Sequence, residues 1–308
     1  MKYYKILRSD MTHHGFKYKE GLNVDINPFD ETPDCGDGLF FSDAENILSF
    51  VNYGDLIAEV EIPDGTKIVQ VRNKYKAHAI VIKNIKPIWT VDTFKYCIEE
   101  GIDIHIKNDN AFQYAAENGN LELVKFLVHN GANIHIDNDW ALQLAVCNGH
   151  LEIIKYLITK EANIHADDDW ALRYAAENGN LEVVKCLIDN GADIHADDDD
   201  ALRWAARNGY LEVVKCLIDN GANIHADDDW ALTFAAGNGY LEIVKYLINK
   251  GANIHAGNDY AFRCAAENGN LDIVKYLVGY DVDIHAVSDW AFQFGTPVVK
   301  KYLETLKK

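Results

Sequence analysis

Seven histidines recur in this sequence at intervals of thirty residues, and regularly spaced histidine is what a metal site or a pH sensor would show. The histidine column consists of His105, His135, His165, His195, His225, His255 and His285. A stack of alike structural units also repeats any residue that its architecture needs. We therefore predict that each ring is hydrogen-bonded to the backbone of a nearby turn and that the column holds no metal. A pH-sensitive column is the alternative.

Runs of aspartate recur with the same spacing, at 167–169, 197–200 and 227–229. Calcium takes about six to eight oxygen ligands around one point. A ladder that advances by one structural unit brings only a few carboxylates to each level. We predict that these aspartates form turns and cap helices, and that together they make an acidic ridge.

The elements that position these residues follow from the thirty-residue period. The segment D-D-D-W-A-L-R-Y-A-A-E-N-G-N-L-E-V-V-K-C-L-I-D-N-G is typical of every unit. Asp169 offers a side-chain acceptor to the free N–H groups at the start of a first helix. Asn178-Gly179 ends that helix, because both residue types tolerate the left-handed conformation, and Asn190-Gly191 ends a second helix in the same way. Each unit is therefore predicted to be a pair of helices.

Two short helices cannot bury their apolar faces alone, so the units must stack into one continuous core. This predicts a mainly α solenoid of helix-turn-helix repeats over 89–308, preceded by a small α+β domain at 1–88. The ends of such an array are expected to be atypical. The sequence indicates a half-repeat cap at 91–105, six full repeats over about 106–285 and a truncated cap at 286–308.

The motif G-A-N-I-H-A, followed by A-L, A-A and N-G-x-L-E-V-V-K-x-L-I, resembles the ankyrin repeat over 91–308. It departs from the common pattern by being about three residues shorter than the usual 33, and by having W-A-L-R or W-A-L-Q in place of T-P-L-H. This variant is similar to the ankyrin proteins that giant DNA viruses of the mimivirus type encode in large families. The resemblance implies an ankyrin-type solenoid, and a viral protein that acts inside a host cell.

The first helix of each unit is apolar on two sides. At about 100° per residue, Leu172 and Ala175 share one side, and Trp170, Arg173 and Tyr174 lie on the other. These rings either pack between adjacent repeats or form the concave partner-binding surface that the ankyrin resemblance implies. Trp, Tyr and Arg dominate the energetics of protein interfaces. The candidate partner-binding residues are Tyr114, Trp140, Trp170, Arg173, Tyr174, Arg203, Trp204, Trp230, Phe234, Tyr260, Arg263 and Trp290.

Charge and composition narrow the classes of partner. The net charge is −19, and residues 91–308 carry −17 of it, with 18 Lys and Arg against 35 Asp and Glu. This field repels nucleic acid and anionic membranes, and it attracts basic proteins. The cysteines of the repeats occupy apolar helical positions, which favours a reducing compartment. With no signal-like N-terminus and no run of eighteen apolar residues, we expect an intracellular, unsecreted and monomeric protein that binds a protein partner.

The first 88 residues read as a mixture of strands and one helix. Apolar-rich runs predict strands at 3–7, 56–62, 67–72 and 79–85, with a turn at Pro63-Asp64-Gly65. The segment D-A-E-N-I-L-S-F-V predicts a helix capped by Ser42 or Asp43. A domain of this size is expected to have too little spare core for a deep pocket.

Fragments of this domain resemble the NAD-binding cleft of ADP-ribosyltransferases. C-G-D-G-L-F-F-S (35–42), a helix and L-I-A-E-V-E-I-P (56–63) follow one another in the family's order, with His14-Gly15 upstream as the nucleotide-facing pair. No glutamate can be assigned as the catalytic one. The chain also has no G-x-x-x-x-G-K-S/T, G-x-S-x-G, H-E-x-x-H or C-x-x-C motif. The sequence therefore predicts a non-enzymatic adaptor without a cofactor, with a repeat-targeted ADP-ribosyltransferase as the alternative.

Overall fold

The computed structural model describes residues 1–13, 15–33, 37–280, 290 and 293–306. The chain forms two compact units, Met1–Leu144 and Ala145–Lys308. The strands give way to helices after Pro87, but the predicted domain boundary at residue 88 stays a prediction, because unit 1 also contains the first helices. His14, His285 and residues 286–289, 291–292 and 307–308 of the predicted cap lie outside the described residues.

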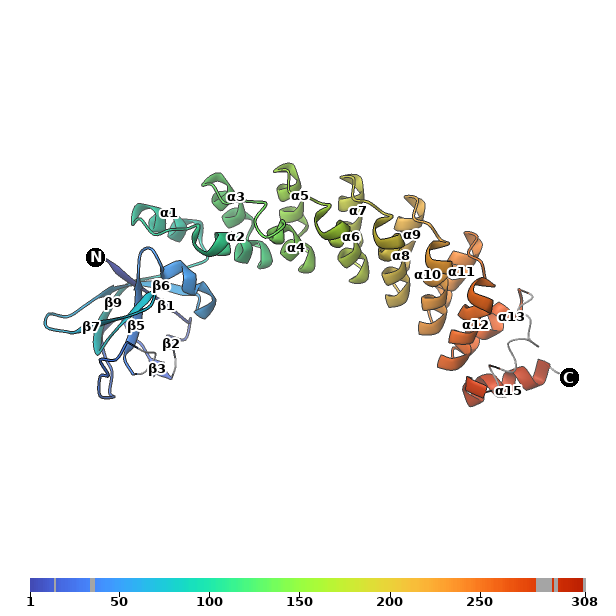
Figure 1. Ribbon diagram of the computed structural model, residues 1–308, viewed down its shortest axis with the longest axis horizontal. Coiled ribbons are helices and arrows are strands. Elements are labelled where there is room, and N and C mark those ends of the chain that lie inside the picture. Colours follow the sequence, from blue (N-terminus) through green and yellow to red (C-terminus); the bar gives the residue numbers. More distant parts are fainter. Residues whose placement is uncertain (14, 34–36, 281–289, 291–292, 307–308) are drawn as a thin grey trace. The chain divides into compact units, whose positions relative to one another are not determined.

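Unit 1 begins with a seven-stranded sheet in which every neighbouring pair is antiparallel (Figure 1). The strand order is β4-β9-β6-β1-β5-β8-β7, and β2 and β3 form a separate hairpin. The strands are β1 (Tyr3–Leu7), β2 (Thr12–His13), β3 (Phe16–Lys17), β4 (Gly21–Val24), β5 (Leu39–Asp43), β6 (Leu56–Glu61), β7 (Ile68–Val71), β8 (Lys74–Ala77) and β9 (Ala79–Pro87).

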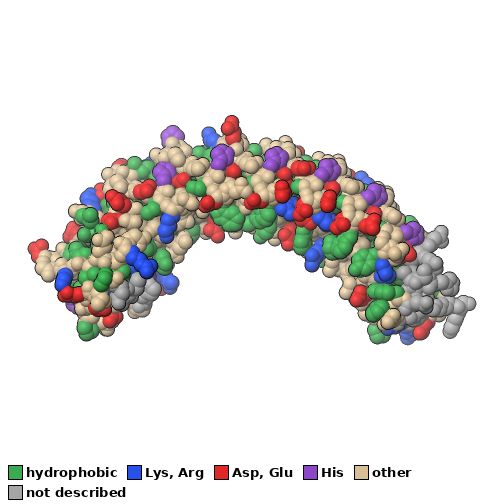
Figure 2. All heavy atoms as spheres, in the orientation of Figure 1, with side chains coloured by type: hydrophobic (Ala, Val, Ile, Leu, Met, Phe, Trp, Pro, Cys, Tyr) green, Lys and Arg blue, Asp and Glu red, His purple; other side chains and the backbone are tan. Residues whose placement is uncertain are grey.

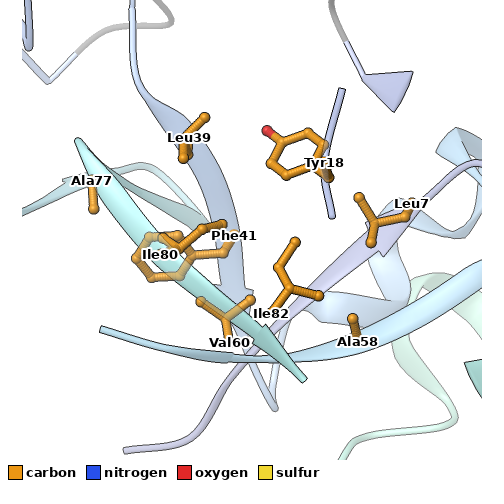
Figure 3. Packing of buried hydrophobic residues seen from close by; sticks show 9 residues of the cluster. All are labelled: Leu7, Tyr18, Leu39, Phe41, Ala58, Val60, Ala77, Ile80 and Ile82. Atoms are coloured by element: carbon orange, nitrogen blue, oxygen red, sulfur yellow. The ribbon is translucent and has the colours of Figure 1, made fainter. Parts of the chain in front are cut away.

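Strand β1 occupies the centre of this sheet, and both of its faces are covered. Successive side chains of a strand point to opposite faces. Leu7 therefore joins the core cluster on one face, where Phe41, Val60 and Ile82 pack with it (Figure 3). Tyr4 points to the other face, where its hydroxyl donates to Glu100 at 3.0 Å. This bond ties the sheet to the end of the first helix of unit 1.

The structure confirms the four predicted strands and the turn at 63–65. The predicted helix at 43–51 is wrong in type and start: the segment forms a 3-10 helix, η1 (Ile47–Tyr53), which begins after Asn46 without a side-chain cap. Ser42 donates instead to the carbonyl oxygen of Asn73, and Asp43 accepts from the backbone N–H of Asn46.

Each thirty-residue unit forms two helices, as predicted. We call the first helix of each pair the inner helix and the second the outer helix. The inner helices are α2 (Ile106–Glu117), α4 (Trp140–Cys147), α6 (Ala166–Glu177), α8 (Ala196–Asn208), α10 (Ala226–Asn238) and α12 (Ala256–Asn268). The outer helices are α3 (Leu121–His129), α5 (Leu151–Thr159), α7 (Leu181–Asp189), α9 (Leu211–Asp219), α11 (Leu241–Asn249) and α13 (Leu271–Val278). Helix α1 (Val91–Glu99) precedes them, and α15 (Pro297–Leu306) follows.

Within unit 2, the inner helices pack against one another in sequence and the outer helices form a second row (Figure 1). Leu172, Ala175 and Ala176 are buried on the predicted side of α6. Val184 and Leu187 of α7 are buried opposite them, and burying a Leu or Val side chain contributes about 1.5–3 kcal/mol. The continuous core that the period predicts is therefore present.

A turn of three left-handed residues lies at the start of each inner helix, or directly before it in the case of α4. In the third full repeat, Asp167, Asp168 and Asp169 have φ angles of 53°, 55° and 54°. Asn and Asp adopt this conformation more readily than other residues with a side chain, and glycine adopts it freely. The equivalent positions hold Asp, Asn or Gly in every described repeat except at Lys107. The aspartate runs are thus a requirement of the backbone.

We expect that Asp168→Val will destabilise the array and that Asp168→Gly will not. Asp168 is exposed and left-handed, so the change tests the backbone alone. The left-handed conformation costs about 1–2 kcal/mol for a residue that has a Cβ atom, and more when the side chain is β-branched. The check is urea unfolding followed by tryptophan fluorescence. Equal midpoints for the two variants would contradict this account of the aspartate run.

Candidate partner-binding face

The buried aspartate at the end of each left-handed turn links the two turns that flank one helix pair. The carboxylate of Asp199 lies 3.1 Å from Nδ1 of His195, and it accepts from the backbone N–H of Asn223, in the turn that follows α9, at 2.7 Å. Equivalent bonds join Asp169 to Asp193 and Asp229 to Asn253. The predicted cap on the aspartate's own helix is therefore wrong, because the carboxylate is directed to a backbone group 24 residues away.

The histidine column serves the same link. In unit 2, the ring nitrogen Nδ1 bonds to the aspartate four residues later in each described repeat, so the predicted backbone partner is corrected to a carboxylate. His105 of unit 1 makes a backbone contact as well, through Nε2 to the carbonyl oxygen of Asn130 at 3.1 Å. The histidines appear in purple, in a row beside the acidic residues in red, in Figure 2.

Removal of this link should cost more than removal of a neighbouring exposed aspartate. Glycine keeps the left-handed backbone, so Asp199→Gly isolates the carboxylate, and Asp198→Gly in the same turn is the matched control. Asp199 is 4% exposed, and a hydrogen bond to a charged group contributes about 1.5–3 kcal/mol. We expect a lower unfolding midpoint in urea for Asp199→Gly than for Asp198→Gly. The reverse order would exclude the link as a source of stability.

Two of the predicted site residues, Arg173 and Arg203, are held by the array itself. Arg203 donates from Nη1 to Asp227 of the next repeat at 2.8 Å and from Nη2 to the carbonyl oxygen of Asp197 at 2.7 Å. Arg173 makes the same pair of contacts one repeat earlier. Their guanidinium groups are therefore positioned as ties between repeats and are mostly covered.

The aromatic residues of the inner helices pack in pairs one turn apart. Trp170 stacks on Tyr174 with ring centroids 4.6 Å apart, and Trp230 meets Phe234 edge to face at 4.8 Å. Tyr260 of the following repeat lies 6.4 Å from the Trp230 ring. Tyr260 is exposed and the other four rings are half-buried, so each one packs against a neighbour and is still partly open to solvent. The aromatic side chains of the inner helices are thus neither fully buried core residues nor fully exposed surface residues.

A stack of aromatic and arginine side chains crosses the boundary between α8 and α10. The guanidinium of Arg207 lies 4.6 Å from the centroid of the Trp204 ring and 5.3 Å from that of Phe234. The indole Nε1 of Trp204 donates to Asp200 at 3.0 Å. Arg207 is exposed, and a cation over an aromatic ring gains about 0.5–1 kcal/mol at exposed sites. The stack therefore fixes an exposed positive charge among aromatic rings.

Beside this stack the surface forms a hollow of about 220 Å³. It is lined by residues that the sequence analysis named, Trp230, Phe234 and Tyr260, and by others that it missed. The missed residues are Arg207, Thr233, Gly237, Asn238, Cys264 and Asn268.

A departure from the repeat could have revealed this hollow. One position of the inner helix holds glutamate at Glu117, Glu177 and Glu267, but cysteine at Cys147, arginine at Arg207 and glycine at Gly237. A Cβ atom at residue 237 would lie 3.4 Å from Cβ of Cys264, so the missing side chain leaves the space open. Positions that vary between repeats thus identify the hollow, because the stacking of the repeats does not require this variation.

The face continues toward the C-terminal end of unit 2. The guanidinium of Arg263 lies 5.1 Å from the centroid of Tyr260 and 5.7 Å from that of Trp290. Tyr260 is 38% exposed and Phe294 is 50% exposed. Trp290 contacts Phe294 at a centroid distance of 5.1 Å. The predicted residues of the last repeats are therefore brought together.

Two predicted residues belong to unit 1, where their surroundings differ. Tyr114 stacks on Trp89 with ring centroids 3.8 Å apart, so it packs against the segment between β9 and α1. Trp140 begins α4 and is 41% exposed. Tyr114 also lines a surface cavity of about 530 Å³ with Arg8 and Asp55 of the strand-rich region.

Ionisation along the face is adjusted by sulfur and burial. The neighbouring Cys264 thiol raises the pKa of Tyr260, and burial raises the pKa of Cys264. The Cys147 thiol likewise raises the pKa of Tyr174. In the part of the chain that the structure describes, no three His, Cys, Asp or Glu side chains meet as a metal site requires. Over the same residues, no helix combines the length and apolar character needed to span a bilayer.

The strand-rich part of unit 1 contains a cavity of about 660 Å³, which contradicts the expectation that this domain leaves no room for one. Residues of β1 and β5 form part of its wall. Gly15 and the segment 38–42 both line the cavity, so two of the fragments that resemble ADP-ribosyltransferases meet there. Glu59 and Glu61 of the third fragment are not among the lining residues. His14 and Cys35 lie outside the described residues.

Comparison with known proteins identifies the repeats. A family model for ankyrin repeats matches residues 88–168, 114–198, 161–228 and 202–288. The ankyrin repeat protein R896 of Acanthamoeba polyphaga mimivirus is 36% identical over 128 residues, which cover 39% of each chain. The uncharacterized protein R869 of the same virus is 34% identical over 40% of this chain and 94% of its own.

A further mimivirus relative, the ankyrin repeat protein R868, is 32% identical over 40% of this chain and 64% of its own length. The chain thus spans about two fifths of R896 and somewhat less than two thirds of R868. Among solved structures, the ankyrin repeat domain of human ASB11 superposes with a TM-score of 0.57 at 23% identity, covering 63% of this chain and 96% of that one. This likeness concerns the fold.

Proposed function

Because the chain belongs to the ankyrin-repeat family, whose repeats are protein–protein interaction modules, we propose that it is an adaptor that grips a protein partner through the inner-helix face of unit 2. The observation that carries this proposal is the exposed stack of Trp204, Arg207 and Phe234 beside the hollow between α10 and α12. The adaptor performs no reaction and needs no cofactor. Its partner is a host or viral protein.

The chemistry of the stack supports a protein partner. Trp, Tyr and Arg are the side chains that contribute most to interface energies. Here the rings are already packed against neighbours, so little side-chain entropy is lost when a partner covers them. A hollow of about 220 Å³ is large enough for one side chain of a partner. The arrangement therefore suits recognition of a protein surface.

The positions that differ between repeats carry the selectivity in this proposal. Arg173 and Arg203, named from the sequence, take part as supports of the face, since their guanidinium groups are engaged with aspartates. Trp204, Phe234 and Tyr260 contribute contact area. Tyr114 and Trp140, in unit 1, belong to the proposed face by sequence equivalence.

Affinity capture with matched variants tests the adaptor. The full chain and a Trp204→Ala, Phe234→Ala double variant are immobilised in parallel. Each is then incubated with an Acanthamoeba lysate. Tyr246→Ala on the outer helix α11 is the control, because Tyr246 is a half-buried aromatic residue outside the inner-helix face. We expect a partner that binds the wild type and the control, and binds the double variant about tenfold or more weakly.

Equal recovery of every captured protein by the wild type and the double variant would contradict the proposal that the inner-helix face binds the partner. Circular dichroism and the unfolding midpoint of each variant serve to separate loss of binding from loss of folding. Capture at higher salt concentration distinguishes specific from purely electrostatic binding. Binding that depends only on the −19 net charge should weaken equally for all variants.

The second candidate function is ADP-ribosyl transfer by the strand-rich domain to proteins that the repeats recruit. Its support is that Gly15 and the segment 38–42 line one cavity. The described carboxylates that line it are Asp25 and Asp37, so the glutamate typical of these enzymes has no counterpart among them.

NAD consumption by the full chain tests this second function. Gly38 has a φ of 130°, and a Cβ atom there would lie 3.3 Å from both Lys76 and Phe29, so Gly38→Ala distorts the cavity wall. Turnover of NAD by the wild type that is lost in Gly38→Ala would support the enzyme. On the adaptor proposal we expect no turnover by either protein, measured as nicotinamide release.

A further inference from the structure

A lysine amine is buried at the centre of the strand-rich sheet. Lys5 lies on β1, the middle strand of seven, and is only 2% exposed. Its Nζ donates to the carbonyl oxygen of Phe40 at 2.6 Å and lies 4.4 Å from the centroid of the Tyr18 ring. No carboxylate of the described residues pairs with it. A buried ammonium without a counter-ion is costly, so this environment favours the neutral amine.

The neutral amine fits the groups around it. Burial, and then the positive charge of Lys74, lowers the pKa of Lys5 to about 7. A neutral amine has two N–H groups and one lone pair. One N–H donates to Phe40, and the π face of Tyr18 can receive the other. The lone pair is left as a nucleophile, which is how desolvation and a neighbouring cation activate lysine.

Lys5 also lines the cavity of about 660 Å³, whose volume is within the range of about 300–1,000 Å³ that is usual for small-molecule sites. Aromatic side chains form much of the wall: Phe16, Tyr18, Phe40, Phe41, Phe50 and Tyr53. The other ionisable groups that line it are His13, Tyr18, Asp25, Asp37 and Lys74. An aromatic cavity with a neutral amine suits an uncharged planar molecule with an electrophilic carbon.

We propose that this cavity is a binding site for small aromatic carbonyl compounds, which condense reversibly with the amine of Lys5. The lone pair of Nζ adds to the carbonyl carbon, and the C=O electron pair moves to the oxygen. That oxygen takes up a proton that the nitrogen releases through water. Loss of water from the carbinolamine then gives the imine. The aldehyde and the amine thus yield an imine and one water, with no oxidant or reductant. The site is independent of the inner-helix face.

Reductive trapping tests the site in the full chain. Benzaldehyde and sodium cyanoborohydride are added at pH 7, and the modified lysines are located by peptide mass mapping. At this pH a larger fraction of Lys5 is neutral than of an exposed lysine with its pKa near 10.4. We expect the amount of label on Lys5 to exceed that on any exposed lysine by about tenfold or more. Lys5→Met should lose this label, and Lys67→Met, which removes an exposed lysine, should keep it.

The pH profile of the wild type decides the matter even where Lys5→Met fails to fold. Labelling of Lys5 should rise around pH 7, and Lys74→Met should move the rise to higher pH, because a neighbouring cation is removed. Labelling of Lys5 equal to that of exposed lysines, or a profile that coincides with theirs, would overturn the proposal. If inorganic phosphate binds beside Lys5 and Lys5 does not react with the aldehyde, the cavity is an anion site, and this result would also overturn the proposal.

Discussion

The buried aspartate at the end of each left-handed turn is the interaction on which the repeat array depends. It is almost fully buried, and its carboxylate accepts from the histidine four residues earlier and from a backbone N–H 24 residues later. Each partner offsets part of the cost of burying the carboxylate. The aspartate is the last of three left-handed residues, so the turn brings its carboxylate to this position and the turn and the link belong together.

This constraint separates the columns of the sequence into two kinds. The histidine, the buried aspartate and the small residues of the inner helices repeat because every interface between repeats has the same geometry. Arg207 and Gly237 depart from the glutamate of their column, and neither takes part in the hydrogen bonds that the described aspartates make with histidine and backbone. A residue that varies on a constant scaffold is free to encode selectivity, and for that reason the hollow beside Phe234 weighs more in the proposed function than the regular tryptophans do.

The helix pairs were predictable from the sequence because their signals are local: an apolar period, and Asn-Gly at the helix ends. The destination of Asp169 was not, since its backbone partner is 24 residues away and a helix cap uses the same residue type. Strands β4 and β8 escaped prediction for a related reason. Asn23 and Lys76 are buried in them, so neither strand has the apolar alternation that marks a half-buried strand. The cavity of unit 1 depends on how distant strands curve, which no local pattern records.

Much of the negative charge of the repeats has a structural role. Asp167, Asp168 and Asp169 supply left-handed backbone and a buried link, and Asp197 and Asp227 hold arginines of the preceding repeats. Much of the acidity of unit 2 is therefore accounted for by folding, before any partner is considered. A basic partner would gain a faster encounter from this field, but the field is nearly the same at every repeat. Discrimination among partners must then come from the uncharged and cationic side chains of the inner helices, where one repeat differs from the next.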